Sequence, residues 1–170
     1  GAAAGIRVVS PAAGTAFPSR AAALAPAVSV HVVDGNGNSL FHLDTVKRQV
    51  AVAVPPIRGA VVPELSANAT TTVACTSGVA TFDDVVVAQP KTGEVTFAFE
   101  TAAEEWATSL TLVVEVGPPV RLALQNGNAT KLWRYGAAES VELDPPPAFI
   151  VTDEAGNHVT DEDSLPAALR

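Results

Sequence analysis

The sequence is short of several residue types, and each shortage narrows the class of protein. It contains 1 cysteine, no methionine and only 5% aromatic residues among its 170 residues. Cys75 has no partner for an intrachain disulfide, so we interpret it as a small buried hydrophobe, with a reactive or intermolecular thiol as the alternative. No apolar run approaches the length of a membrane span, and none resembles a signal peptide. We therefore expect no membrane span in this chain.

Positive charge is also scarce. The chain carries 10 Lys and Arg residues against 18 Asp and Glu residues, a formal net charge of −8. Its densest basic pair is Lys47-Arg48. Binding to nucleic-acid phosphates requires a clustered basic surface, so no nucleic-acid partner is expected.

The residues that dominate instead are Val, Ala, Thr and Pro, a composition typical of short β-strands. Thirteen prolines and twelve glycines separate the apolar runs at close intervals. Between them lie about seven or eight predicted strands, the pattern of an all-β, Greek-key β-sandwich. No crossover helix of the kind that a parallel sheet needs is predicted. The predicted strands are Ile6–Val9, Val28–Val33, Val46–Val54, Thr70–Cys75, Val79–Phe82, Val85–Val87, Glu94–Glu100 and Trp106–Val116.

Two of these segments carry the sharpest local predictions. The alternation between Glu94 and Glu100 places Val95, Phe97 and Phe99 on one buried face. The turn at Ser77-Gly78 joins Thr70–Cys75 to the following strand, and we expect these two strands to pair as a hairpin.

The pattern begins again near residue 120. Val120–Leu124 is similar to Ile6–Ser10, and the triplet Asp34, Gly37 and Asn38 returns as Asp153, Gly156 and Asn157, about 119 residues later. The sequence therefore predicts a first β-sandwich in residues 1–116, a Gly-Pro-Pro linker at 117–119 and the N-terminal part of a second sandwich in 120–170. We expect the remaining strands of the second copy either beyond this chain or from a neighbouring subunit.

These elements resemble the immunoglobulin-like tandem repeats of large extracellular and cell-surface proteins, including invasin-type and bacterial-Ig-like repeats. The resemblance rests on the Asp-x-x-Gly-Asn strand end at 34–38, on Gly78–Phe82, and on the apolar strand and glycine turn of Val85–Gly93. The paired cysteines around a core tryptophan, which mark antibody-type domains, are absent. The Ala, Val and Pro bias also fits a mastigoneme-like filament protein of the algal flagellar surface.

Residues 34–38 (Asp-Gly-Asn-Gly-Asn) are similar to the start of a calcium loop, but an EF-hand would need Gly at position 39 and Glu at position 45, where Ser and Thr stand. A plain turn is therefore the preferred interpretation. A calcium ion at residues 34–38 is the alternative, and a calcium site between repeats, built from Asp153 with the acidic residues Asp161, Glu162 and Asp163, is an equally weak one.

No catalytic or cofactor site is predicted. The histidines have no metal-ligand spacing with Cys75, and no Gly-x-Ser-x-Gly motif or phosphate-binding glycine loop occurs. The adjacent pair Asp83-Asp84 is interpreted as a bend because neighbouring strand residues point to opposite faces. The three histidines are His31, His42 and His158.

Two N-x-Ser/Thr sequons are candidate glycosylation sites, at Asn68 and Asn128. Both fall in predicted loops at strand edges, where a glycosyltransferase has access.

Together these observations predict a non-enzymatic structural or adhesive repeat module of an extracellular fibrous or cell-surface protein. Its expected partners are other copies of the same protein or another surface or filament protein, contacted through sandwich faces and edges, together with N-glycans. A flagellar or ciliary surface is one such setting. The alternatives are a carbohydrate- or calcium-binding accessory module of a larger enzyme and an intracellular filamin-type cytoskeletal sandwich.

Overall fold

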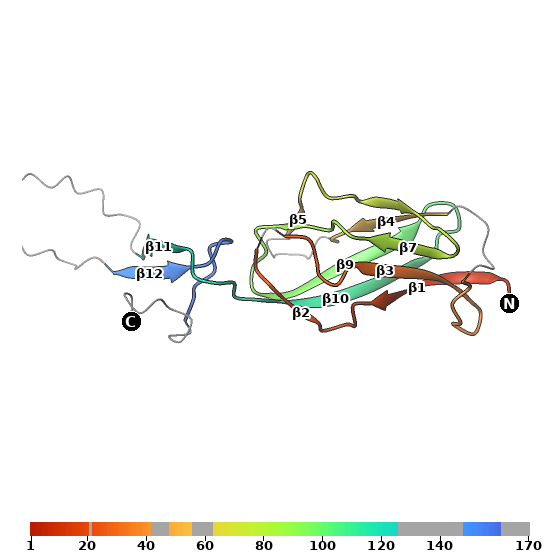
Figure 1. Ribbon diagram of the computed structural model, residues 1–170, viewed down its shortest axis with the longest axis horizontal. Helices are drawn as coiled ribbons and strands as arrows, with labels where there is room; N and C mark the ends of the chain where they lie inside the picture. Colours follow the sequence, from red (N-terminus) through yellow and green to blue (C-terminus); the bar gives the residue numbers. More distant parts are fainter. Residues whose placement is uncertain (21, 42–47, 56–62, 126–147, 161–170) are drawn as a thin grey trace, which may run out of the picture.

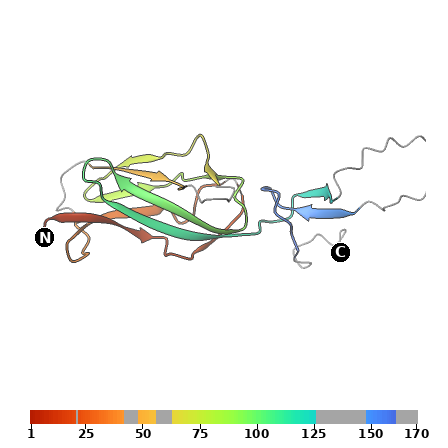
Figure 2. The ribbon, with the colours of Figure 1, turned by 180° about the vertical axis from the view of Figure 1, so that it is seen from behind.

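A computed structural model describes residues 1–20, 22–41, 48–55, 63–125 and 148–160. Across these ranges the chain forms strands, turns and loops without a helix, which confirms the predicted all-β class. Figures 1 and 2 show an elongated molecule in which most strands run along the long axis. We call the part formed by residues 1–116 the two-sheet body. A separate pair of strands lies at the end of this body away from the N-terminus.

The two-sheet body contains a three-stranded and a five-stranded sheet. The first has the order β1-β3-β7 and is antiparallel, with β1 at Ala3–Ser10, β3 at Val28–Asp34 and β7 at Val79–Phe82. The second has the order β2-β10-β9-β4-β6, and only the contact between β2 and β10 is parallel. Its strands are β2 (Ala16–Pro18), β4 (Gln49–Ala53), β6 (Thr72–Ala74), β9 (Gly93–Thr101) and β10 (Ala107–Glu115).

Two short strand pairs complete the described structure. In the body, β5 (Glu64–Leu65) pairs with β8 (Val87–Ala88). The C-terminal strand pair consists of β11 (Arg121–Leu124) and β12 (Phe149–Thr152), which are antiparallel. None of the described residues forms a helix long and apolar enough to cross a membrane.

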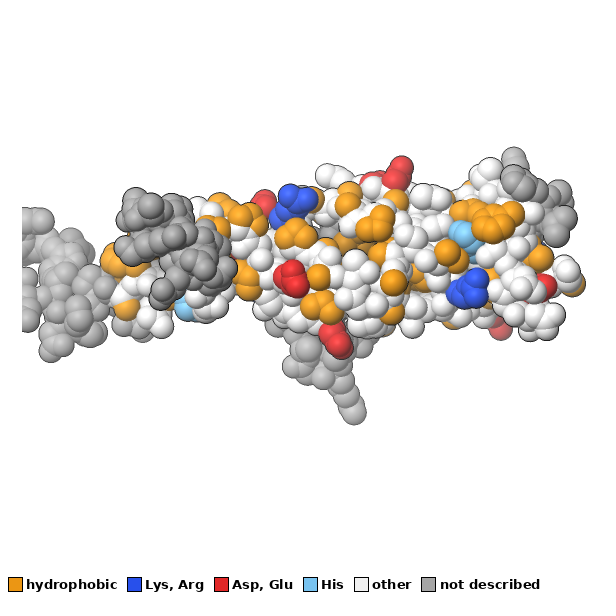
Figure 3. All heavy atoms as spheres, turned by 60° about the horizontal axis from the view of Figure 1, so that its bottom comes forward, with side chains coloured by type: hydrophobic (Ala, Val, Ile, Leu, Met, Phe, Trp, Pro, Cys, Tyr) orange, Lys and Arg blue, Asp and Glu red, His pale blue; other side chains and the backbone are white. Residues whose placement is uncertain are grey.

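The two sheets share one hydrophobic core. Val95, Phe97 and Phe99 of β9 are buried, as the alternation predicted, and they face the inner side of the three-stranded sheet. There Phe82 packs edge-on against Phe99, with the ring centroids 5.5 Å apart. Burial of alternate β-branched and aromatic side chains is the main force that holds the two sheets together. Figure 3 shows that hydrophobic side chains on one outer face lie in small separate groups among polar atoms.

The predicted hairpin between Thr70–Cys75 and the following strand is wrong. β6 pairs with β4, while β7 pairs with β3 in the other sheet. Ser77 and Gly78 have φ angles of 50° and 76°, and they form a tight turn closed by the bridge between Thr76 and Val79. At this turn the chain passes from one sheet to the other, because only pairing with β3 places Phe82 in the common core.

Two other predicted strands are shorter than expected. The predicted strand at Val46–Val54 begins at Gln49, and residues 46–47 lie outside the described ranges. In the predicted strand at Val85–Val87, Val85 and Val87 are buried, but regular pairing starts only at Val87.

Candidate junction site

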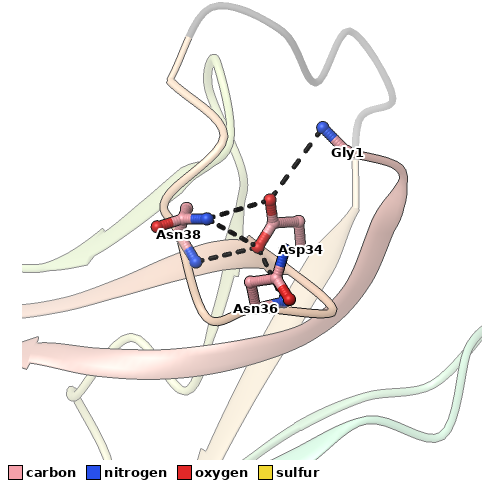
Figure 4. Close-up of polar contacts among 4 residues, drawn as sticks. All are labelled: Gly1, Asp34, Asn36 and Asn38. Atoms are coloured by element: carbon pink, nitrogen blue, oxygen red, sulfur yellow. Dashed lines mark hydrogen bonds and ion pairs between the residues drawn. The ribbon is translucent and has the colours of Figure 1, made fainter.

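A compact turn follows β3 at residues 34–38, and we call it the Asp34 turn (Figure 4). The Oδ1 atom of Asp34 accepts hydrogen bonds from the backbone N–H groups of Asn36 and Asn38, each at 2.9 Å. The Asn38 side-chain amide donates to both carboxylate oxygens, at 3.3 and 3.2 Å. Gly37 adopts φ 79°, a conformation that side chains disfavour. An aspartate that accepts from the backbone after it is a standard way of closing such a turn.

The same turn recurs at residues 153–157, directly after β12, and we call it the Asp153 turn. Asp153 Oδ1 accepts from the Asn157 N–H at 2.8 Å, and Asn157 Nδ2 donates to Asp153 Oδ2 at 3.0 Å. Gly156 has φ 78°, one degree from its counterpart in the first turn. The repeated sequence motif therefore encodes one turn structure, formed twice.

The surroundings of the two turns differ. Asp153 is completely buried because the end of the two-sheet body covers it. The Ser19 hydroxyl donates a hydrogen bond to Asp153 Oδ2, and the Gly117 N–H donates to the same oxygen at 3.0 Å. Gly117 N–H also reaches Ser19 Oγ at 3.0 Å. Three chain segments that are distant in sequence thus meet on one carboxylate oxygen.

The segment between β8 and β9 supplies the rest of the contact. Asn157 Nδ2 donates to the Pro90 carbonyl at 3.1 Å, and Asn157 Oδ1 accepts from the Thr92 N–H at 3.3 Å. The Lys91 ammonium donates to the Ala155 carbonyl at 2.7 Å. We call this whole set of contacts the junction. We name its two halves by the direction of most of these hydrogen bonds: the turn side, Asp153 to Asn157, is the acceptor half, and the body side, formed by Ser19 and residues 90–92, is the donor half. Only the hydrogen bond from Asn157 to Pro90 runs the other way among the described contacts.

The hydrogen bonds at the junction keep a buried carboxylate ionised. Burial by itself raises the pKa of Asp153, but the hydrogen bonds from Ser19, Asn157 and Gly117 together outweigh it and lower the pKa to about 2. A buried charge is tolerated when donors satisfy its oxygens, as they do here. In the Asp34 turn the backbone and side chain of Asn38 lower the pKa of Asp34, against a smaller opposing effect of burial.

Gly117 is sterically required at the junction. A Cβ atom at this position would lie 2.8 Å from the backbone oxygen of Ser19 and 3.5 Å from Asp153 Cβ. The two prolines that follow restrict the backbone φ angles of the linker. The predicted linker at 117–119 is therefore also part of the junction.

Strand pairing corrects the predicted alignment of the two copies. Ile6 pairs with Val32 and Leu122 pairs with Val151, and each of these partners stands two residues before its turn aspartate. Ile6 therefore corresponds to Leu122 and not to Val120, a shift of two residues. A shift of two leaves every side chain on the same face of the strand, so alternation alone does not detect it.

The structure describes both turn aspartates but only Asp153 of the alternative calcium site. Both Oδ1 atoms of the turn aspartates accept backbone N–H groups, as in the plain turn that was preferred. Residues 161–163, the acidic partners of the alternative site, lie outside the described ranges. Within those ranges, no three His, Cys, Asp or Glu side chains are grouped so that they could hold a metal ion.

Of the two sequons, Asn68 lies in an exposed turn after β5, and Asn128 lies outside the described residues. The sequon's Thr70 hydroxyl donates to Asp84 Oδ2 at 2.6 Å, while Asp83 is exposed. Asp84 therefore anchors the sequon loop, and the aspartate pair is a bend with its two side chains in different surroundings.

The remaining candidates have structural surroundings. His31 is buried between the hydroxyls of Ser29 and Ser39, each 3.0 Å from a ring nitrogen, and burial lowers its pKa. His158 is exposed after the Asp153 turn, whereas His42 lies outside the described ranges. Cys75 is 4% exposed and belongs to the core cluster, in agreement with a small buried hydrophobe.

The body side of the junction escaped prediction from sequence. Ser19, Lys91 and Thr92 carry no motif, and they come near Asp153 only because β2, β9 and β10 lie side by side in one sheet. The one available signal was the Gly-Pro-Pro linker, which marks where two units meet. Searches against protein-family models, curated proteins and solved structures found no match to this chain.

Proposed function

We propose that this chain is a structural repeat module of an extracellular fibrous or cell-surface protein, built from immunoglobulin-like β-sandwiches that are joined in tandem. The observation that carries the proposal is the junction itself. A flexible spacer would need only a polar linker, whereas here a buried carboxylate, an amide side chain and a lysine hold the second turn against the first body. Such a contact transmits orientation from one repeat to the next.

The strand order supports the immunoglobulin-like part of the proposal. The order β1-β3-β7 corresponds to strands A, B and E of such a sandwich, and β10-β9-β4-β6 to strands G, F, C and C′. The path also crosses repeatedly between sheets: β3 and β7 lie in one, β4, β6 and β9 in the other. These crossings are what a Greek-key connection requires.

Partner binding in this proposal uses edges and exposed loops. Among the described strands β6 is the outer one of the five-stranded sheet, so in this proposal it pairs with a strand from another copy or from a different surface protein. Asn68 lies in an exposed turn, where an N-glycan would project into solvent. Its mechanism is geometric: each body buries its own core, and the junction fixes the direction of the array.

The rigidity of the junction tests the proposal. In the full chain, residual dipolar couplings of the two-sheet body and of the C-terminal strand pair should fit one alignment tensor. Asp153→Ala removes the acceptor of Ser19 and Gly117, so the two parts should then need separate tensors. Asp34→Ala is the matched control, because it removes the same kind of turn aspartate away from the junction. Separate tensors in the unmodified chain would contradict the proposal.

A further inference from the structure

We propose that the Asp34 turn is the acceptor half of a second junction, and that its partner is the donor half of another domain of the same kind. This inference rests on the proposed function and extends it from one junction to a repeating contact. The partner surface is defined by the junction that this chain already contains: a serine hydroxyl, a lysine ammonium, a backbone N–H and a backbone carbonyl, supplied by Ser19 and residues 90–92.

The first observation is that the complete geometry of the acceptor half is already formed at the Asp34 turn. The carboxylate, the asparagine and the left-handed glycine hold the same relative positions as in the Asp153 turn. Asn157 uses its Oδ1 and Nδ2 atoms on the backbone of the neighbouring body and is 8% exposed. Its counterpart Asn38 is exposed, with its side-chain amide directed at Asp34 alone in the described contacts.

The second observation concerns the glycine that lies beside each turn aspartate, ahead of the strand that pairs with β3 or β12. Gly1 stands four residues before Gly5, which pairs with Val33, and Gly117 stands four residues before Arg121, which pairs with Thr152. The Gly1 nitrogen, here an ammonium group, forms an ion pair with Asp34 Oδ2 at 3.9 Å, and the Gly117 peptide N–H donates to the equivalent oxygen of Asp153 at 3.0 Å (Figure 4).

Both glycines lie against their turn aspartate, and at each a Cβ atom would meet a neighbour at 2.8 Å: Asp34 Oδ2 for Gly1 and the Ser19 backbone oxygen for Gly117. A Cβ atom on Gly1 would lie 2.9 Å from Asp34 Cβ, and one on Gly117 would lie 3.5 Å from Asp153 Cβ. The chain therefore approaches the Asp34 turn by the route that it takes through the junction, along a path that only a glycine fits without displacement.

The third observation is the placement of the two halves on the body. The Asp34 turn follows the end of β3 beside the N-terminus, whereas Ser19 and residues 90–92 contact the Asp153 turn at the opposite end of the body (Figures 1 and 2). A head-to-tail contact of this kind is heterologous, and it extends into an open filament when the rotation between copies does not close a ring. Repeating the observed junction at Asp34 would continue the long axis of the molecule.

The two turns differ at one position that faces the partner. Asn36 occupies the place of Ala155, whose carbonyl accepts the Lys91 ammonium. Because that contact uses the backbone, it is available at Asn36 as well. Because the Asn36 side chain is longer than that of Ala155, the second junction must accommodate the additional atoms at this position.

The test is a tandem fusion in which residues 1–116 are joined directly to Gly1 of the full chain. Val116 of the added copy then precedes Gly1, as it precedes Gly117 in the natural junction. Only the added copy is isotope-labelled. The hydrogen exchange rate of its Thr92 amide is compared between the parent fusion and a variant with Asp34→Ala in the full-chain copy. We expect exchange at least about tenfold slower in the parent, since docking protects the amide. Equal exchange rates would overturn the inference.

A second variant controls for a structural effect of Asp34→Ala on β3, which ends at Asp34. Ser19→Ala combined with Lys91→Ala, placed only in the added copy, removes donors and leaves the Asp34 turn unchanged. It should accelerate exchange of the added Thr92 amide to a similar degree, and an unchanged rate would also count against the inference. In a sample that is labelled only in the full chain, the natural junction serves as the reference. If the Thr92 amide of the full chain is protected and that of the added copy is not, only this inference fails. If neither amide is protected, the proposed function fails as well.

Discussion

At the residue scale, Asp153 combines two roles that are usually separate. Its Oδ1 atom closes a local turn, and its Oδ2 atom binds groups from two distant segments of the body. Hydrogen bonds to a charged group contribute more than those between neutral groups, and an unsatisfied buried partner is costly. One carboxylate therefore couples the folding of the turn to its docking.

This arrangement makes the junction sensitive to acid. The pKa of Asp153 is about 2 in the folded chain, below its ordinary value of 3.8, so the turn and its docking together are favoured wherever the carboxyl of the unfolded chain is ionised. Asn157 supplies the share of the turn, and Ser19 and Gly117 supply the share of docking. The combined contribution of turn and docking, about 2 kcal/mol, is present above the unfolded pKa near 4 and is lost as the pH falls through 2. We expect the Gly117 amide resonance to move to its undocked position over this window, in an NMR titration of the full chain.

Asp153→Asn provides the control for that titration, because an amide does not ionise. Its Gly117 resonance should show no transition that depends on residue 153. An Asp153 carboxyl carbon that titrates near pH 4 in the unmodified protein would contradict the expected shift.

At the scale of elements, β9 is the centre of the two-sheet body. It pairs with β10 on one side and β4 on the other, and its inward side chains are almost completely buried. The strand thus contributes both to the hydrogen-bonded ladder and to the core. On its outward face, Thr96 Oγ1 lies 2.9 Å from Thr111 Oγ1 of β10.

Truncation of Phe97 should therefore be among the most damaging changes in the body. Phe97 is fully buried, and Phe97→Ala should lower the free energy of unfolding by about 3–5 kcal/mol through lost apolar contact and a residual cavity. Chemical denaturation followed by tryptophan fluorescence measures the change. Val9→Ala is the control: Val9 is 45% exposed on β1, so its loss should cost less than about 0.5 kcal/mol. Equal effects of the two substitutions would disprove the central role of β9.

At the scale of the whole molecule, the chain has two distinct ends. One carries the Asp34 turn, and the other carries the junction with its C-terminal strand pair (Figure 1). In that pair Leu122 and Phe149 are 55% and 53% exposed, although they correspond to the buried Ile6 and Val30 of the body. The pair therefore presents to solvent the face that the first copy buries in its core.

The proposed extracellular location of the molecule is testable through its two sequons. If the natural host secretes the protein, the intact mass of the natively purified chain should fall after enzymatic deglycosylation, because Asn68 lies in an exposed turn. Asn68→Gln should remove the share of the mass difference that this site carries, and Asn128→Gln the remainder. An unchanged mass after deglycosylation would favour the cytoskeletal alternative over a surface location.

Local pattern was sufficient to predict most strands. The strict alternation from Glu94 to Glu100 identified a strand and its buried face, since a pleated strand turns successive side chains to opposite sides. The Asp34 turn and its repeat at Asp153 were equally visible, because the hydrogen bonds of each turn join residues at most four positions apart. Interactions over such short separations depend on the chemistry of a few neighbouring residues.

Pairing and docking required the folded chain. β6 and β7 adjoin in sequence but lie in different sheets, and the choice depends on burying Phe82 against Phe99, 17 residues further along the chain. Ser19 reaches Asp153 across 134 residues, a contact with no trace in the local composition. Short-range preferences thus specified the strands and turns, whereas the free energy of closing one core, shared by distant segments, selected which of them meet.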